Sequence, residues 1–278
     1  MLVICNGMGR GGSTLQYNLV RALLTVTESG EGHGYMVDQE GHTQFMPSAQ
    51  LWAWANAREF HLVKMHAAHA QIEEFLLAGE TRVCYIYRDI RDVALSRRTA
   101  FGERGAKLVR GLQRNHNTYY VLRDVRDKFA SCFVWQRYEE VTVDLVRAAR
   151  ELADLIGLSV SDSELDTVVD ACSLDTTKGM CDELRSGLEN EVQRIREKSP
   201  RLAAMYLQKI GRGQGPGDIV LLDQKTLLLY NHIGARGGAS GVWKDSLDSA
   251  TLEMVMTNHG EWLEENGYLS EPPDSGGS

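Results

Sequence analysis

The first 27 residues constrain the fold of this chain more than any other segment. An apolar run, LVIC, covers residues 2–5, a glycine-rich run, NGMGRGGS, covers residues 6–13, and apolar side chains recur at helical spacing over residues 14–27. A buried strand, a tight loop and a helix in this order begin a βαβ unit. The opening therefore predicts an α/β fold with a glycine loop at the end of its first strand.

The glycine loop is suited to hold a phosphate. Gly7 and Gly12 have the GxxxxG spacing at which backbone N–H groups can point inward around an anion, and the helix that follows adds partial positive charge. The cation of this loop is Arg10, whereas position 13, where a Walker A loop has lysine, is Ser13. A tight turn without a ligand is the alternative.

Strand and helix patterns alternate along the rest of the chain, which predicts a central parallel sheet flanked by helices on both faces. We expect one domain over residues 1–268, with a mostly helical insert at about 159–230 and a disordered tail at 269–278. Residues 28–50 are polar and irregular, and residues 141–156 form one long amphipathic pattern. The other strands are predicted at 60–65, 82–87 and 131–136, and the other helices at 50–57, 67–77 and from 89 onward.

Composition excludes several classes of protein. With 43% hydrophobic residues the chain can form a core, and its formal net charge of −8 disfavours nucleic acid and anionic membranes as partners. No apolar run approaches the ~18 residues that a membrane span needs, and the first residues do not resemble a signal peptide. The five cysteines lack CxxC spacing, so we expect a cytoplasmic protein without a metal site.

Two residues after the predicted strand at 82–87 have the chemistry of an anion site. Arg88 follows the strand directly, at the edge where ligands bind in open α/β sheets. Ser96 lies two helical turns further on, so a phosphate could take a bidentate contact from the arginine and a hydroxyl from the serine. The alternative is a surface helix with ion pairs among Asp89, Arg91 and Asp92.

The sequence Lys64-Met65-His66 places polar side chains at the end of another predicted strand. A neutral imidazole there can accept a proton from a substrate hydroxyl. His61 and His69 flank this histidine and are alternative bases.

Residues 236–244, RGGASGVWK, combine an arginine with glycines that allow close backbone approach to an anion. A flexible surface loop anchored by Trp243 is the alternative interpretation.

Taken in chain order, these motifs resemble those of the PAPS-dependent sulfotransferases (PAPS is 3′-phosphoadenosine 5′-phosphosulfate). The first loop of that family reads P-[KR]-S-G-T-T and aligns with residues 9–14; its K-T-H motif aligns with 64–66. Its Arg and Ser eight residues apart match Arg88 and Ser96, and its late motif, R-K-G-x-x-G-D-W-K, matches 236–244 at most positions. Tyr138-Glu139-Glu140 is similar to its Y-E-D element.

The resemblance implies a P-loop-containing nucleoside triphosphate hydrolase-like sulfotransferase fold and a metal-independent transfer of the sulfuryl group from PAPS. His66 is then the general base, and Arg10 and Lys64 stabilise charge at the sulfonate and the 5′-phosphate. The product is PAP, 3′-phosphoadenosine 5′-phosphate. The residues implied to bind the nucleotide are Arg10, Gly11, Gly12, Ser13, Thr14, Arg88, Ser96, Tyr138, Arg236, Gly237 and Gly238.

The chain also departs from the family pattern. Gly9 and Gly11 replace the family's proline and serine, and Gly237 and Val242 replace a lysine and an aspartate. A P-loop kinase of a small molecule and a non-catalytic PAP-binding protein of the same fold are therefore alternatives. The family's dimer motif is only partly matched, so the oligomeric state stays open.

The expected acceptor is a small molecule with a hydroxyl or an amine-type nitrogen. Its pocket is expected between residues 33–56, 97–120 and 176–230, the first of which is rich in aromatic side chains. Those aromatic residues could equally belong to the core.

Overall fold

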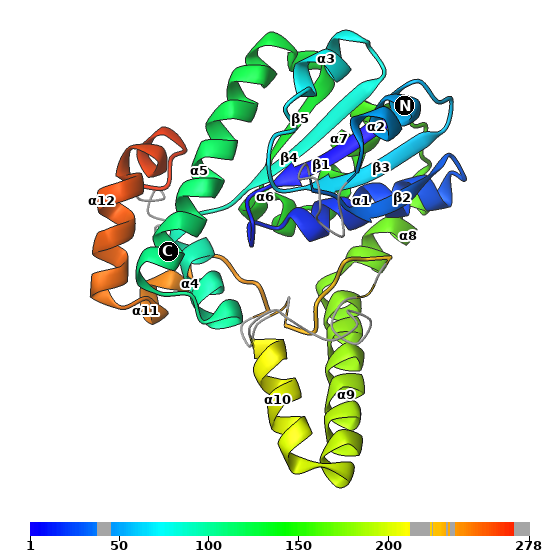
Figure 1. Ribbon diagram of the computed structural model, residues 1–278. Helices are drawn as coiled ribbons and strands as arrows, with labels where there is room; N and C mark the ends of the chain where they lie inside the picture. Colours follow the sequence, from blue (N-terminus) through cyan, green and yellow to red (C-terminus); the bar gives the residue numbers. More distant parts are fainter. Residues whose placement is uncertain (38–45, 212–222, 224, 232, 234–236, 270–278) are drawn as a thin grey trace, which may run out of the picture.

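The computed structural model describes residues 1–37, 46–211, 223, 225–231, 233 and 237–269. Five strands form one parallel sheet in the order β2-β3-β1-β4-β5, and helices cover both of its faces (Figure 1). The predicted fold class is confirmed. The strands are β1 (Leu2–Gly7), β2 (Gly30–Tyr35), β3 (Phe60–Met65), β4 (Thr81–Tyr87) and β5 (Phe133–Arg137).

Alternate side chains of the central strand β1 enter two separate cores. Leu2 and Ile4 face one core, whereas Val3 and Cys5 face the other. This alternation explains why β1 is apolar from Leu2 to Cys5, since a strand buried on both faces has no polar side. The first core takes side chains from α2 (Ser48–Ala55), α3 (Ile72–Leu77), α4 (Ile90–Phe101), α5 (Gly105–Lys128) and α12 (Ser249–Glu265).

The second core is covered by the helix after the glycine loop and by the helices after β5. Gly157, at φ 74°, ends α7, and Ser161 starts α8 with a reciprocal capping box to Glu164. The helices on this face are α1 (Ser13–Val26), α6 (Tyr138–Val143), α7 (Leu145–Ile156) and α8 (Asp162–Cys172).

The predicted helical insert consists mainly of α9 (Leu174–Lys198) and α10 (Pro200–Gly211), which form a hairpin that extends away from the sheet (Figure 1). A short helix, α11 (Trp243–Ser246), precedes α12, and a 3₁₀ turn, η1 (Ala130–Cys132), precedes β5. No helix in the described part of the chain has both the length and the apolar character to cross a bilayer.

Three local predictions are wrong. Residues 30–35 form the edge strand β2, where the sequence GEGHGY looked irregular, because an edge strand needs no apolar alternation and Gly30 packs closely on Phe60 of β3. The helix predicted at 141–156 is two helices, since Asp144 ends α6 and caps α7. Helix α3 starts at Ile72, not at residue 67.

Candidate functional site

A cavity of about 660 Å³ lies at the carboxyl ends of the strands, where β1, β3, β4 and β5 deliver the loops and side chains that follow them. This is the edge of a parallel sheet at which α/β proteins bind ligands. Most of the side chains that the sequence singled out line it: Arg10, Gly12, Ser13, Thr14, Lys64, His66, Arg88, Ser96, Tyr138, Gly237 and Gly238.

The glycine loop enters the cavity between β1 and the N-terminus of α1. Gly12 has φ 99°, and a Cβ at this position would collide with the ring of Tyr138, so only glycine fits. Arg10 also has a positive φ, 73°, which costs an arginine about 1–2 kcal/mol. Ser13 and Thr14 lie in the first turn of α1, where the helix dipole and the backbone N–H groups at the helix N-terminus favour an anion.

A residue that sequence reasoning missed holds this loop in place. The Asn115 side chain, on α5, accepts a hydrogen bond from the Gly9 N–H (3.0 Å) and donates one to the Gly9 carbonyl (3.2 Å). Asn115 is 5% exposed. This reciprocal amide contact positions a loop that is otherwise rich in glycine. A single asparagine 106 residues away carries no recognisable pattern in the sequence.

His66 is held in one tautomer. Its Nδ1 lies 3.0 Å from the Gly7 carbonyl, which can only accept, so Nδ1 carries the proton and Nε2 keeps its lone pair. Burial, and then the charge of Lys64, lowers the pKa of His66 to about 3. The imidazole is therefore neutral at pH 7 and can accept a proton in the cavity.

Lys64 and Thr14 connect β3 to the glycine loop. The Lys64 ammonium donates to the Thr14 hydroxyl at 2.6 Å, and both side chains are buried. Burial, together with the charge of Arg10, lowers the pKa of Lys64 to about 7. An anion bound in the cavity would favour the charged form of this lysine.

Arg10 and Arg88 approach the same part of the cavity from different loops. The Arg10 Nε donates to the Ser96 hydroxyl at 3.0 Å, which brings the loop cation to the residue predicted to act with Arg88. Burial, followed by repulsion from Arg88, lowers the pKa of Arg10 to about 10, so it stays charged at neutral pH. The sequence placed these groups in separate motifs, and the fold brings them together.

The late glycine-rich loop closes over Arg88. The Arg88 guanidinium donates to the carbonyls of Gly238 (3.1 Å) and Ala239 (2.7 Å) and lies 4.4 Å above the centre of the Tyr138 ring. The Tyr138 hydroxyl also donates to the Gly238 carbonyl, at 2.9 Å. Gly237 and Gly238 have φ of 63° and 74°, which favours glycine at both positions.

Asp92 anchors this late loop. Its carboxylate accepts the backbone N–H groups of Gly241 (2.7 Å) and Trp243 (3.0 Å) and lies 3.7 Å from the Arg88 guanidinium. The alternative of a surface helix does not hold: Asp89 and Arg91 do form an ion pair, but Arg88, Asp89, Arg91 and Asp92 are all buried.

Replacing Asp92 by Asn should loosen the late loop. The amide of Asn keeps the volume of the side chain but has only one acceptor oxygen, so one of the two loop N–H groups loses its partner. A buried donor without a partner costs about 1–3 kcal/mol, and we expect urea unfolding to show a loss of that size. Asp245→Asn, in exposed α11, is the matched control, and an equal loss in both variants would contradict the anchoring role.

The described residues that line the cavity include cations but no carboxylate. Arg10, Lys64, Arg88 and a further arginine, Arg21, contribute positive charge in a chain whose formal net charge is −8, whereas Arg97 is ion-paired with Glu103 at 2.7 Å. The local field therefore opposes the net charge and favours an anionic ligand.

Some predicted site residues lie elsewhere. Gly11 does not line the cavity; its N–H donates to the Met8 carbonyl at 2.7 Å and shapes the loop. Arg236 lies outside the described residues. Neither His61 nor His69, the alternative bases, lines the cavity. Of the described part of the aromatic segment 33–56, only Tyr35 reaches the cavity, while Trp52 packs against the core residue Phe75.

No protein-family model and no curated protein matches this sequence. The solved structures similar to it share the sulfotransferase fold, and this chain has the same α/β fold. Mouse sulfotransferase SULT7A1 complexed with PAP aligns with 95% of this chain and 84% of its own, at a TM-score of 0.57 and 10% identity. Retinol dehydratase in complex with androsterone and PAP aligns with 99% of this chain and 82% of its own, at a TM-score of 0.54 and 14% sequence identity. Identities this low establish the fold and not the activity.

Proposed function

We propose that this protein transfers the sulfuryl group of PAPS to a small-molecule acceptor. The observation that carries the proposal is the cavity itself, in which Arg10, Lys64 and Arg88 surround a helix N-terminus and the neutral His66. The fold supports it, since the similar structures named above are complexes with PAP.

The cavity offers two subsites for the phosphates of PAPS, a 5′-phosphate subsite and a 3′-phosphate subsite. We assign the 5′-phosphate to the first turn of α1, where Ser13, Thr14 and Lys64 line the cavity. We assign the 3′-phosphate to Arg88 and Ser96, which line the cavity together with Gly238. The 3′-phosphate subsite distinguishes PAPS from ATP, because ATP has no 3′-phosphate to bind there. Ser13 in place of the Walker lysine also argues against the kinase alternative.

His66 acts as the general base in this proposal. Its Nε2 takes the proton of the acceptor O–H or N–H as that atom forms its bond to sulfur, and the bond between sulfur and the bridging oxygen of PAPS breaks in line. Arg10 and Lys64 stabilise the negative charge that develops on the released 5′-phosphate. Fixed cations and helix N–H groups supply this stabilisation without a metal ion.

The remaining cavity wall favours an apolar acceptor. Eight aliphatic side chains line the cavity together with Tyr35, whose ring centre lies 5.3 Å from that of His66. Retinol dehydratase, which has the same fold, is known in complexes with retinol and with androsterone. We therefore propose an apolar alcohol or amine as acceptor. The aliphatic wall comprises Leu15, Leu145, Leu174, Met180, Leu227, Leu228, Leu229 and Ile233.

Activity should depend on the protonation of Lys64. A lysine with a lowered pKa is charged below that pKa, so kcat/KM for PAPS should fall as the pH rises through about 7. Bound PAPS favours the ammonium form, so the fall in kcat should come at higher pH. The His66 imidazole should cause no loss between pH 5 and 7, since its pKa is about 3.

The variant Lys64→Gln should remove this alkaline loss from the profile of kcat/KM. Lys107→Gln, at an exposed position, is the control and should keep it. An unchanged alkaline loss in Lys64→Gln would assign the titration to another group.

The proposal is tested by calorimetric titration with PAP, AMP and ATP in parallel. We expect PAP to bind without Mg²⁺ and AMP to bind much more weakly, because AMP lacks the 3′-phosphate. That result would justify a screen of apolar alcohols and amines with PAPS. A preference for Mg-ATP would support the kinase alternative. Binding of PAP with no transfer to any acceptor would support the non-catalytic alternative.

A further inference from the structure

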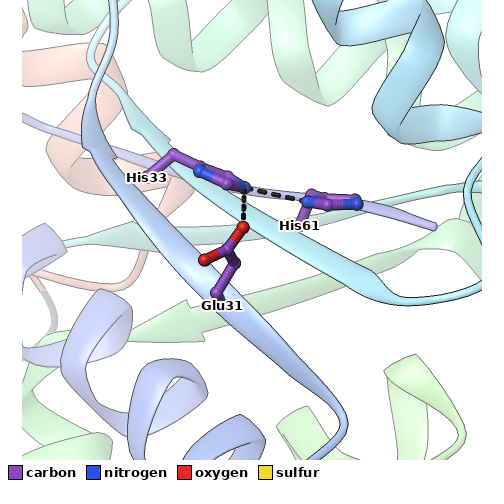
Figure 2. Close-up of side chains that lie close together, drawn as sticks. All are labelled: Glu31, His33 and His61. Carbon is purple, nitrogen blue, oxygen red and sulfur yellow. Dashed lines mark hydrogen bonds and ion pairs between the residues drawn. The ribbon is translucent and has the colours of Figure 1, made fainter.

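Three side chains with metal-binding chemistry meet at the edge of the sheet. Glu31 and His33 lie on β2, and His61 lies on β3 directly opposite Glu31 in the register of the two strands. Figure 2 shows the three side chains pointing toward one another. None of them lines the cavity, so the proposed sulfuryl transfer does not use them.

The donor atoms of this cluster already lie close to the spacing of a coordination sphere. His33 Nε2 is 2.9 Å from His61 Nδ1 and 3.8 Å from Glu31 Oε1, and all three ligand atoms lie within 4.8 Å of one another. Ligands at about 2.0–2.2 Å from a tetrahedral Zn²⁺ are roughly 3.3–3.5 Å apart. Movements of about 1 Å or less in the side chains would therefore suffice.

The backbone and a neighbouring helix direct the two imidazoles. The pairing of β2 with β3 shifts register between Gly32 and Tyr35, so His33 lies in a bulge, a feature that redirects a side chain. The Trp54 ring, from α2, stacks on His33 at 3.9 Å and 10°, and on His61 at 5.5 Å and 16°. The ring planes are thus fixed by packing as well as by the hydrogen bond between them.

We propose that Glu31, His33 and His61 bind a divalent transition-metal ion of the Zn²⁺ type. Two imidazoles and a carboxylate are ligands that Zn²⁺ prefers, and water would complete the coordination. The Glu31 side chain is 72% exposed, so an ion can enter from solvent. The bound ion links edge strand β2 to β3 beside the bulge, where the ladder of backbone hydrogen bonds is interrupted. Its role is structural, since β2 carries Tyr35 into the cavity, and β3 carries Lys64 and is followed directly by His66.

Calorimetric titration of the metal-free protein with ZnCl₂ tests the proposal. We expect one saturable site in the unmodified chain and at least tenfold weaker binding in the double variant His33→Gln/His61→Gln, because the loss of an outer-sphere partner alone costs about 10- to 100-fold. The matched control is His116→Gln, since His116 pairs with His259 in the other close histidine pair of the described residues. This control should bind Zn²⁺ as the unmodified chain does.

Two further measurements keep the test decisive if the double variant folds poorly. Glu31→Gln changes an exposed side chain and should weaken Zn²⁺ binding without lowering the melting temperature of the metal-free protein. Zn²⁺ should raise the melting temperature of the unmodified chain and of His116→Gln. The rise should be much smaller for Glu31→Gln. Equal Zn²⁺ affinity in the unmodified chain, Glu31→Gln and the double variant, or no saturable binding in the unmodified chain, would overturn the proposal. PAP is proposed to bind in the cavity, which Glu31, His33 and His61 do not line. A failure of the metal-site proposal therefore leaves the proposed function unaffected.

Discussion

His66→Ala is expected to lower kcat about 10²–10⁴-fold while leaving the affinity for PAP nearly unchanged. The reason lies in the geometry: the Gly7 carbonyl fixes the proton on Nδ1, so Nε2 is the basic nitrogen of a side chain that lines the cavity. The phosphate subsites are formed by other residues, so PAP binding does not need His66. Single-turnover transfer from PAPS, with PAP titration in parallel, measures the two quantities separately.

His116→Gln is the control for this experiment, because His116 lies on α5, where it contacts His259 of α12, and does not line the cavity. It should retain full turnover. A loss of turnover below tenfold in His66→Ala would remove this histidine from the role of base. Large losses of both turnover and PAP binding would assign it to holding the loop, through its contact with the Gly7 carbonyl.

Arg88→Ala is expected to weaken PAP binding by about 30-fold or more, because truncating a buried charged partner of a bound anion costs about 2–5 kcal/mol. The affinity for AMP should change little, since AMP lacks the 3′-phosphate that would contact Arg88 and Ser96. Titration of the variant with both nucleotides gives the two values. The ratio of the PAP affinity to the AMP affinity then measures how much the 3′-phosphate contributes to binding.

Two variants accompany this measurement. Arg110→Ala, at an exposed position on α5, should bind PAP normally. Arg88→Lys should recover part of the affinity, because lysine keeps the charge but not the bidentate geometry. Arg88 also binds the carbonyls of Gly238 and Ala239, so a variant that weakens PAP and AMP equally would show that the arginine shapes the loop instead of reading the 3′-phosphate.

The arrangement of the central sheet could be predicted because it depends on local patterns. Strands buried on both faces are mostly apolar, and β1, β3 and β4 were found within a few residues of their ends. The edge strand β2 was missed because its sequence, GEGHGY, is polar and rich in glycine, whereas the other edge strand, β5, carries apolar residues and was predicted. The glycines and polar residues of β2 satisfy the contact with β3 without any apolar alternation.

The candidate site was predicted as separate motifs, each at the end of a strand. The parallel sheet then brings residues 10, 64, 66, 88 and 138 to one cavity, as the order of elements implied. Residues that act from the interior of a helix were not predictable. Asn115 and Asp92 are polar residues in helical segments, and nothing in their local sequence separates them from solvent-exposed neighbours.

The sequence by itself determined which residues stand at the carboxyl edge of the sheet, because the apolar period of each strand marks where it ends and the next residue must lie at that edge. Only the tertiary structure decided which partners hold those residues. The contact of Asn115 with Gly9, the anchoring of the late loop by Asp92, and the meeting of His33 with His61 each join residues far apart in the chain. Such contacts depend on the packing of whole helices and on a strand bulge, and these are set by the sum of many weak interactions.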